Sequence, residues 1–327
     1  MRSRRPLGTL RIVASDEIVS CHRRRRFIGS HLVHGLLAEG YRVRVLDNLS
    51  TGHRANLEGV LDRVEFVEGD ICDTQIARQA TEGMDVVFHQ AAMASVPFSL
   101  EYPLESHRTC ATGTLSMLIA AKDAGVKRFV YAASSSAYGD QPYSSKREID
   151  IPSPLSPYAV AKLAGEYYCQ SFYHSFGMET VGLRYFNVYG PRQDPNSPYS
   201  AVIPLFVTRL LSGQSPIIYG DGQQSRDFTF VENVVLGNIL ASKVEGIGGK
   251  VINMAEGRQT TLLQLLTLLD HHLGTGIGPK FEAARVGDVR ESLADITLAR
   301  ALLGYDPKIG LDEGLAKTID YYRTWRP

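Results

Sequence analysis

Short apolar runs alternate along the chain with longer segments of helical pattern. The short runs are rich in Val, Phe and Tyr and predict β-strands over 41–48, 63–70, 84–92, 126–134 and 178–187. Segments 30–40 and 112–125, which lie between such runs, predict helices. Strands separated by helices are typical of βαβ units, so we expect an α/β fold with a Rossmann-type, doubly wound parallel sheet.

Composition limits the classes of function. The chain has 327 residues, of which 44% are hydrophobic and 21% charged, which suits one large or two modest domains. Its formal net charge is zero, which argues against a general nucleic-acid or anionic-membrane binder. No apolar run is long enough to span a bilayer. We therefore expect neither nucleic acid nor a membrane as a partner.

The cysteines and the N-terminal segment bear on the compartment. Cys21, Cys72, Cys110 and Cys169 are scattered without the spacing of a metal site or a disulfide framework. This pattern favours reduced thiols and no bound metal. The N-terminal segment is basic, yet it lacks the apolar core and the small-residue cleavage site of a secretion signal. Together these features predict a cytoplasmic location.

Ligands of doubly wound sheets bind at the carboxyl ends of the strands. Asp47 follows the run "VRVL" and stands where an acid accepts hydrogen bonds from an adenosine ribose. Its charge would repel a 2′-phosphate, so NAD is favoured over NADP; the alternative is an ordinary solvated Asp in a turn. Asp70 and Ile71 are placed to meet the adenine, and Ala91 and Ala92 are small enough for a dinucleotide to lie close.

Tyr158 and Lys162 are four residues apart, which puts both on one face of a helix. A Lys ammonium beside a phenol stabilises the phenolate and lowers its pKa, which makes a usable general base. The pair alone is a weak signal, because half-exposed helix pairs have the same spacing. Ser134 strengthens it, since its hydroxyl can bind the substrate oxygen that Tyr158 deprotonates. Ser135 and Ser136 are either helpers of this group or turn formers.

From Phe27 onward the chain resembles the extended short-chain dehydrogenases/reductases of the NAD-dependent epimerase/dehydratase family, and among them the UDP-hexose 4-epimerases. The resemblance covers about nine-tenths of the chain through the collinear motifs "FIGSHL", "VLDNLSTG", "HQAAMASVP", "SSSAYGD", "YAVAK", "LRYFNVYGPRQDP", "YSAVIP", "IYGDGQQSRDF" and "RVGDVRESLAD". It implies that Ser134, Tyr158 and Lys162 oxidise the C4 hydroxyl of a UDP-sugar, with NAD as the cofactor. It also implies a homodimer.

The same resemblance implies two sets of binding residues. The cofactor set is Phe27, Ile28, Gly29, Asp47, Asn48, Asp70, Ile71, Gln90, Ala91, Ala92, Tyr158, Lys162 and Tyr185. The substrate set is Ser134, Ser135, Ser136, Asn187, Val202, Ile203, Pro204, Tyr219, Arg226, Arg285, Asp288 and Ser292.

Several members of the substrate set also have a chemical interpretation of their own. The Asn187 amide can hold a diphosphate oxygen, although it can also cap a turn. Tyr219 can stack on a base, and Asp288 can meet a ribose hydroxyl. Arg226 and Arg285 can pair with diphosphate charge, although an isolated Arg is usually a solvated surface charge.

Ser292 is the candidate for sugar selectivity. By the resemblance, the residue four after the Asp of the "GDV" motif stands over the C2 substituent of the sugar, where a bulky Tyr restricts the pocket to glucose and galactose. The small Ser292 leaves room for an N-acetyl group. We therefore expect the N-acetylated UDP-hexoses to be accepted together with UDP-glucose and UDP-galactose. In the alternative, Ser292 only caps or packs the helix predicted over 293–300.

The phosphate turn departs from the family pattern. The family has Thr-Gly-Gly-Ala-Gly-Phe-Ile-Gly here, and of its glycines only Gly29 remains. Arg23 and Arg26 stand at the first two of the three positions where the tight turn and the close approach to the pyrophosphate require glycine. As written, this turn predicts poor NAD binding. The stretch "DEIVSCHRRRR" can be written in codons that, shifted by one base, spell a strand and Thr-Gly-Gly-Ala-Gly. We interpret residues 1–26 as an out-of-frame translation; the rival is a basic tail that binds an acidic partner.

These features predict an NAD-binding domain over 1–184 and a mainly nucleotide-sugar-binding domain over 185–327, with some segments returning to the first. The expected reaction is reversible C4 epimerisation of a UDP-hexose. One alternative is a nucleotide-sugar 4,6-dehydratase or decarboxylase. Dehydratases, however, carry an Asp-Glu pair where this chain has Ser135 and Ser136, which cannot supply the acid and the base. The other alternative is an inactive sugar-nucleotide-binding relative.

Overall fold

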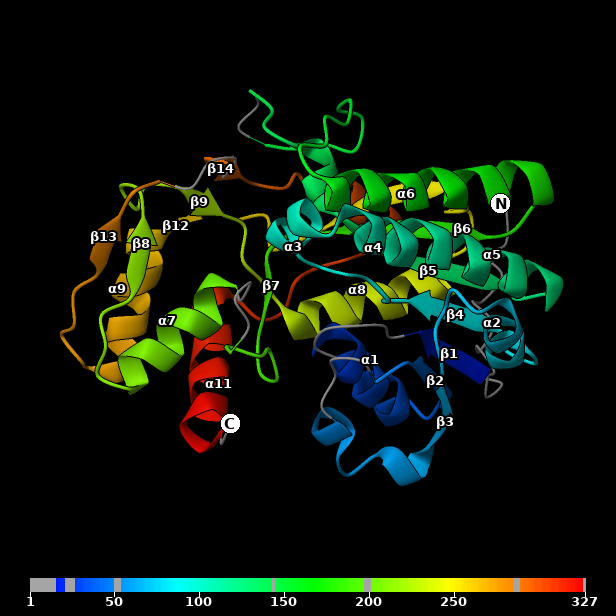
Figure 1. Ribbon diagram of the computed structural model, residues 1–327, viewed down its shortest axis with the longest axis horizontal. Coiled ribbons are helices and arrows are strands. Elements are labelled where there is room, and N and C mark those ends of the chain that lie inside the picture. The colour runs from blue at the N-terminus through cyan, green and yellow to red at the C-terminus, as the bar shows by residue number, and fades with distance from the viewer. Residues whose placement is uncertain are drawn as a thin grey trace, which may run out of the picture.

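The computed structural model describes residues 16–20, 27–49, 54–142, 145–196, 201–284 and 289–325, and only the backbone of 16–20 and 54–55. Its centre is a seven-stranded sheet in the order β11-β6-β5-β4-β1-β2-β3 (Figure 1). Every neighbouring pair in this sheet is parallel. The strands are β11 (Lys250–Met254), β6 (Thr180–Tyr185), β5 (Arg128–Ser134), β4 (Val86–His89), β1 (Asp16–Ser20), β2 (Arg42–Asp47) and β3 (Val64–Glu68).

This order confirms the predicted fold class and the five predicted strands. The chain runs outward from β1 to β3 on one side and then from β4 to β11 on the other side. The direction therefore reverses between β1 and β4, which is where doubly wound sheets bind ligands. β11 returns to the sheet beside β6 and so brings a late segment of the chain next to the first half.

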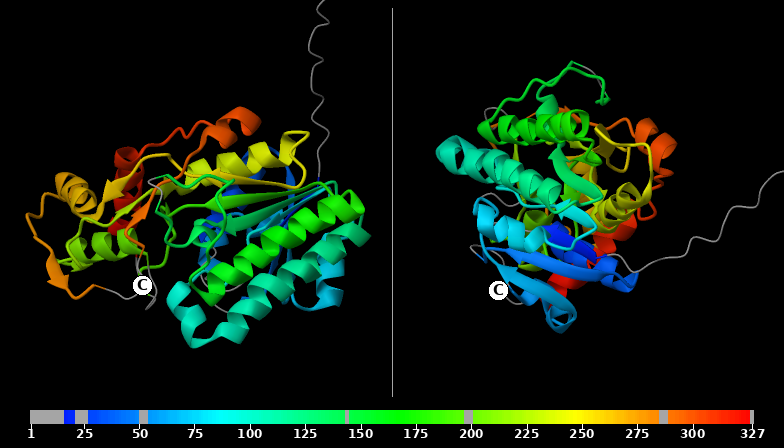
Figure 2. Two further views of the ribbon diagram at one scale, coloured as in Figure 1. Left: turned by 90° about the horizontal axis from the view of Figure 1, so that it is seen from above. Right: turned by 90° about the vertical axis from the view of Figure 1, so that its right-hand side faces the viewer.

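Helices cover both faces of the sheet (Figure 2, left). One core lies under α1, α8 and α10, and the other under α2, α5 and α6. Fully buried side chains such as Leu32 and Met117 fill these layers, each contributing roughly 1.5–3 kcal/mol by burial. The helices are α1 (Phe27–Ala38), α2 (Thr74–Thr81), α5 (Gly113–Asp123), α6 (Pro157–Phe176), α8 (Val231–Lys243) and α10 (Thr297–Leu303).

Short helical elements connect these layers. The segment α3 (Val96–Glu101), α4 (Pro103–His107) and π-helix η3 (Arg108–Thr112) leads into α5 and packs beside α6. The 3-10 turns are η1 (Arg54–Leu57), η2 (Leu61–Arg63) and η4 (Ser135–Tyr138), of which η4 directly follows β5.

A third apolar cluster lies in the C-terminal part, at the left of Figure 1. It joins α7 (Val202–Leu211), α9 (Leu262–Leu273) and α11 (Leu311–Thr324). Three small sheets accompany these helices: β8 (Ile217–Tyr219) with β13 (Lys280–Glu282), β7 (Val188–Tyr189) with β10 (Thr229–Phe230), and β12 (Thr260–Thr261) with β9 (Ser225–Arg226) and β14 (Glu291–Ser292).

Local sequence explains why α6 begins and ends where it does. The Ser156 hydroxyl accepts a hydrogen bond of 3.2 Å from the Ala159 N–H, and Pro157 occupies the first helical position. Gly177 ends the helix in the left-handed conformation with φ 66°. Inside the helix, a Cβ at Gly165 would lie 2.2 Å from the Tyr131 hydroxyl. Glycine at this position therefore lets α6 lie directly against β5.

Two general properties concern the described part of the chain. None of its helices is long and apolar enough to cross a membrane. Its three cysteines, Cys72, Cys110 and Cys169, are free thiols, and Cys21 lies outside the described residues.

Candidate active site

The predicted catalytic residues meet at the carboxyl end of β5. Ser134 is the last residue of this strand, and its Oγ accepts hydrogen bonds from the Ser136 N–H at 3.2 Å and the Ser136 hydroxyl at 2.9 Å. Ser135 and Ser136 form the first turn of η4. Ser136 is thus both a turn former and a direct partner of Ser134, so the two interpretations of this residue are compatible.

Tyr158 lies in the first turn of α6, facing Ser134. A hydrogen bond with the Ser134 hydroxyl lowers the pKa of Tyr158, but burial outweighs it and raises that pKa well above its ordinary value. A phenol whose pKa is raised stays protonated at neutral pH and therefore cannot accept a proton. A nearby cation is therefore required if Tyr158 is to accept a proton.

Lys162 is the cation one helical turn further along α6, so the predicted shared face is confirmed. It is 1% exposed, and its Nζ has no hydrogen-bond partner among the described residues. The Nζ lies 4.4 Å from the centroid of the Tyr131 ring. Burial lowers the pKa of Lys162. A buried ammonium without an oxygen partner is costly, so this arrangement fits a site that is completed by the oxygens of a bound group.

Strands β9 and β14 bring together Arg226 and Ser292, two of the predicted substrate residues. β9 and β14 run parallel, and Arg226 is the register partner of Ser292. Both side chains are partly buried. α10 begins at Thr297 with Ile296 as its N-cap, so the alternative that Ser292 caps this helix is wrong. Tyr219, at the end of β8, accepts a hydrogen bond of 2.6 Å from the Gln224 side chain through its carbonyl.

The chain matches the model of the NAD dependent epimerase/dehydratase family over residues 24–255. It belongs to this family. A UDP-glucose 4-epimerase of Mycolicibacterium smegmatis is 38% identical over 302 residues, which cover 91% of this chain and 96% of the relative.

Solved structures of similar proteins agree with this assignment. The UDP-N-acetylglucosamine 4-epimerase of Methanobrevibacter ruminantium M1, in complex with UDP-N-acetylmuramic acid, is 37% identical with a TM-score of 0.90, covering 95% of this chain and 99% of its own. The UDP-glucose 4-epimerase of Thermotoga maritima with UDP-glucose is 38% identical with a TM-score of 0.88, covering 94% and 98%. Further structures of similar proteins were determined with NAD.

The family cofactor, NAD, fits two features of the site. The unpartnered Lys162 ammonium matches ribose hydroxyls, and the Asp47 carboxylate ends β2 at the same edge of the sheet. Asp47 is 2% exposed, so the alternative of a solvated turn residue is wrong. Its Oδ1 accepts a hydrogen bond of 2.7 Å from the Leu49 N–H. Asn48, between them, is partly buried.

The residues predicted to meet the adenine differ in exposure. Asp70 Oδ1 accepts a hydrogen bond of 2.8 Å from the Cys72 N–H, and its Oδ2 lies 3.8 Å from Arg108. Ile71 is fully buried. Its side chain packs so closely against Gly113 of α5 that a Cβ at Gly113 would lie 2.4 Å from the Ile71 Cδ1. Any contact of Ile71 with a nucleotide must therefore use its backbone.

The end of β4 lies between the cofactor and catalytic residues. Ala91 is fully buried in the core under α5 and α6, whereas Ala92 packs in the small apolar cluster that includes Tyr158. Gln90 donates a hydrogen bond of 3.0 Å to the Tyr185 hydroxyl. The Asn238 side chain of α8 donates to the same hydroxyl at 2.8 Å. Asn238 was missed by sequence analysis, because its helical segment carries no motif.

The first turn of α1 faces the C-terminal part. Phe27 is buried in the third apolar cluster, Ile28 packs against both that cluster and the core under α1, and Gly29 is buried. Phe27 is thus a structural contact between the two parts of the chain. Arg23 and Arg26, which replace the family's glycines, lie outside the described residues.

The remaining substrate candidates differ in the exposure of their side chains. The side chain of Asn187 is exposed, and its carbonyl accepts a hydrogen bond of 3.1 Å from the Thr229 N–H. Val202 is partly buried at the start of α7, while Ile203 and Pro204 are buried, Ile203 within the third cluster. Direct side-chain contact with a nucleotide is therefore open to Val202 but not to the other two. Two further candidates, Arg285 and Asp288, lie outside the described residues.

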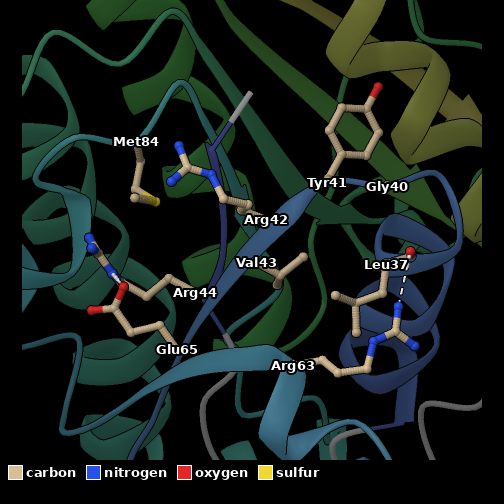
Figure 3. Close-up of a pocket in the computed structure, with 9 residues that line it drawn as sticks. All are labelled: Leu37, Gly40, Tyr41, Arg42, Val43, Arg44, Arg63, Glu65 and Met84. Atoms are coloured by element: carbon tan, nitrogen blue, oxygen red, sulfur yellow. Dashed lines mark hydrogen bonds and ion pairs between the residues drawn. The ribbon is translucent and has the colours of Figure 1, made fainter. Parts of the chain in front are cut away.

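A separate cavity of about 480 Å³ lies at the amino ends of β2 and β3, away from the catalytic residues at the carboxyl end of β5 (Figure 3). It is lined by Leu37, Gly40, Tyr41, Arg42, Val43, Arg44, Arg63, Glu65 and Met84. Arg44 pairs with Glu65 at 2.9 Å and donates to the Ala80 and Glu82 carbonyls, while Arg63 donates to the Leu37 carbonyl. Because these arginines are engaged and the cavity adjoins the amino ends of the strands, it is not the ligand site of this fold.

Proposed function

We propose that the protein catalyses reversible epimerisation at C4 of a UDP-hexose. The observation that carries the proposal is the meeting of Ser134, Tyr158 and the unpartnered Lys162 at one edge of the sheet. A hydroxyl partner, a phenol and a buried cation form a proton-accepting group for an alcohol. The names of the similar proteins support the same reaction.

Each residue has a defined task in this proposal. Tyr158 accepts the proton of the C4 hydroxyl, and Ser134 holds the C4 oxygen in place. Lys162 stabilises the phenolate and offers its ammonium to ribose hydroxyls. NAD, when bound beside Lys162 and Asp47, would supply what these side chains lack, namely a reversible acceptor for the C4 hydride that allows its return to the other face of the sugar. Between the two transfers the 4-keto sugar has to turn inside the site while Tyr158 keeps the proton.

For the substrate, we place the diphosphate near Arg226, with Asn187, Val202 and Tyr219 among the nucleotide contacts. The pairing of Arg226 with Ser292 puts a small hydroxyl side chain beside this group. A small side chain leaves space for an N-acetyl group at C2. We therefore propose that UDP-N-acetylglucosamine and UDP-N-acetylgalactosamine are turned over in addition to UDP-glucose and UDP-galactose.

The dehydratase or decarboxylase alternative is less well supported. Water loss needs an acid and a base beside the catalytic hydroxyl, and Ser135 and Ser136 supply neither. An inactive relative stays an alternative because of the arginines at 23 and 26. The deciding experiment incubates the purified chain with UDP-glucose and NAD and follows UDP-galactose by chromatography. NAD extracted from the same preparation is measured in parallel, so lack of cofactor is distinguished from lack of chemistry.

We further propose the predicted division into an NAD-binding domain, 1–184, and a mainly sugar-nucleotide-binding domain, 185–327. We also propose a cytoplasmic homodimer. Support for the dimer comes from exposed apolar side chains on neighbouring helices: Leu104 on α4 at 83%, Val160 and Tyr167 on α6 at 53% and 54%. α4 packs against α6, and Val160 and Tyr167 are seven residues apart on one helix face. A second copy of the chain would cover this surface.

A further inference from the structure

A buried ion pair lies beside the catalytic helix and has no part in the proposed proton transfer. Glu166 on α6 is 1% exposed, and Arg184 on β6 is 4% exposed. Arg184 Nε lies 3.0 Å from Glu166 Oε1 and 3.2 Å from Oε2, and its Nη2 lies 2.7 Å from Oε2. The guanidinium therefore engages both oxygens of the carboxylate, which is the strongest geometry for such a pair.

The sequence offers Glu166 a second partner. Lys162 precedes it by four residues on α6, a spacing at which a Lys and a Glu can form an ion pair along the helix. In this structure the Lys162 Nζ makes no hydrogen bond with the Glu166 carboxylate, and the charge of Glu166 raises the pKa of Lys162 by less than burial lowers it. Arg184 instead donates hydrogen bonds to both oxygens of the Glu166 carboxylate.

Arg184 is itself held in place from two sides. Its backbone pairs with Ala133 of β5, one residue before Ser134. Its guanidinium carbon lies 4.5 Å from the centroid of the Tyr138 ring, and the Tyr138 hydroxyl donates a hydrogen bond of 2.7 Å to Asn253 on β11. A stacked, bidentate guanidinium cannot easily be replaced by the flexible ammonium of a lysine.

We propose that Arg184 is a positioning residue, which holds the Glu166 carboxylate away from Lys162 and so keeps the Lys162 ammonium available to Tyr158 and to the cofactor. This inference rests on the proposed function for the roles of Tyr158 and Lys162. It assigns a reason to the buried ion pair, since Glu166 without Arg184 would capture the cation on which the phenolate depends.

The surroundings of Lys162 make the effect specific. Its titratable neighbours are Glu166 and Cys169 on α6, Cys110 on η3 and Tyr131 on β5, and Tyr158 stands one helical turn before it on α6. Burial raises the pKa of both thiols and both phenols, so these four groups are neutral at pH 7. Glu166 is the carboxylic acid among these neighbours. Burial raises its pKa, whereas the hydrogen bonds and charge of Arg184 and the charge of Lys162 lower it, so Lys162 is the cation left to pair with it when Arg184 is removed.

The first test measures Lys162 itself and needs no catalysis. The full chain is labelled with ¹⁵Nζ-lysine, the Lys162 signal is assigned with Lys162→Arg, and its pKa is followed by NMR. In Arg184→Met the released carboxylate pairs with the ammonium, and the pKa of Lys162 should rise by about one unit or more. In the double variant Glu166→Gln/Arg184→Met it should return close to the parent value. An unchanged pKa in Arg184→Met, or equal values in both variants, overturns the proposal.

Two further variants separate this effect from simple loss of structure. Arg128→Met removes another buried arginine of the sheet, which pairs with Glu179 at 3.4 Å, and should leave Lys162 unchanged. Arg184→Lys retains a buried cation but engages the carboxylate at one point, so it should raise the pKa of Lys162 by a smaller amount. If Arg184→Met does not fold, Arg184→Lys decides: no rise there contradicts the proposal.

The second test uses epimerisation by the chain with a restored glycine turn. In Arg184→Met, the acidic limb of the pH profile of kcat/KM should move to higher pH, with about a tenfold loss at pH 7 for each unit. The double variant should regain activity although it lacks both residues. A purely structural ion pair predicts no such recovery of the pH profile. Absence of epimerisation in the parent chain contradicts the proposed function, whereas the NMR result still tests Arg184.

Discussion

Arg226 and Ser292 are register partners in the parallel strands β9 and β14, although 66 residues separate them in the chain (292 minus 226). Asp227, the next residue after Arg226, accepts hydrogen bonds from the Glu256, Gly257 and Ala294 N–H groups at 3.0, 3.0 and 3.2 Å. One buried carboxylate therefore fixes the backbone beside Arg226 and just beyond Ser292. Side chains of adjacent strands lie roughly 5 Å apart, so the proposed diphosphate ligand and the proposed sugar-selecting residue are neighbours.

Ser292→Tyr should suppress turnover of the N-acetylated UDP-hexoses and spare UDP-glucose and UDP-galactose. The added phenol fills the space that an acetamido group at C2 needs, and a glucose hydroxyl is smaller. The measurement is kcat/KM for both substrate pairs with a restored glycine turn, and Ser292→Ala, which stays small, serves as the control. Equal loss of both pairs, or a parent chain that cannot use the N-acetylated pair, contradicts the selecting role of Ser292.

Tyr158→Phe should lower turnover by ~10²–10⁴-fold, because the general base is lost while the ring remains. Lys162→Ala should also remove activity, since the phenolate loses its cation and the ribose loses a ligand. UDP-sugar binding, measured by calorimetry, should stay nearly unchanged in Tyr158→Phe. Tyr168→Phe, which removes a phenol from the same helix at a partly exposed position, should behave as the parent does. Activity of Tyr158→Phe within tenfold of the parent would contradict the assignment of Tyr158 as the general base.

The chain as it stands should retain little NAD, because arginines at 23 and 26 replace glycines of the phosphate turn. Replacing residues 1–26 by Met-Lys-Leu-Phe-Leu-Val-Thr-Gly-Gly-Ala-Gly should restore both NAD content and epimerisation. In this repaired chain, Asp47→Ala should weaken NAD binding and reduce discrimination against NADP. Equal NAD content in both chains shows that the turn is misinterpreted. Sequencing the coding DNA around Phe27 tests the frameshift directly.

Asp227 should make stability depend on pH. It is fully buried, and burial raises the pKa of its carboxyl from 3.8 to about 7 despite the three N–H donors. The folded chain then binds this proton more tightly than the unfolded chain, so the contribution is complete below about pH 4 and is lost as pH rises through 7. Relative to Asp227→Asn, the free energy of unfolding should fall by at most about 4 kcal/mol over this range.

Denaturant unfolding at pH 4, 5, 6 and 7 measures this difference. The matched control is Asp221→Asn, which changes a carboxylate on the surface that pairs with Arg290 at 3.2 Å. Its stability should differ from that of the parent by a nearly constant amount over the same range. A constant difference for Asp227→Asn as well would show that the buried carboxyl titrates normally.

The double variant Leu104→Glu/Tyr167→Glu should convert the proposed dimer into a monomer, because a second copy would have to bury two unpaired carboxylates. Sedimentation velocity measures the change in mass. Phe281→Glu places the same charge on an apolar residue of β13 that is 53% exposed and lies in the C-terminal part (Figure 1). This control should leave the mass unaltered. A monomeric parent, or a double variant of unchanged mass, excludes these helices as the interface.

The sequence by itself determined the elements and the catalytic helix. The alternating pattern located the strands that became β2 to β6, and the spacing of Tyr158 and Lys162 put them on one face of α6. Such features depend on neighbours within a few residues, because side-chain periodicity and capping are local properties. The resemblance to the epimerases also depended on motifs that are short and contiguous.

Only the tertiary structure decided which distant residues meet. The pairing of Arg226 with Ser292, the joint hydrogen bonding of Gln90 and Asn238 to Tyr185, and the capture of Glu166 by Arg184 rather than Lys162 are all absent from the local pattern. Each depends on strand register or helix packing between segments far apart in sequence. Periodicity predicts that a residue is buried, but the partner in the interior is set by how the elements pack.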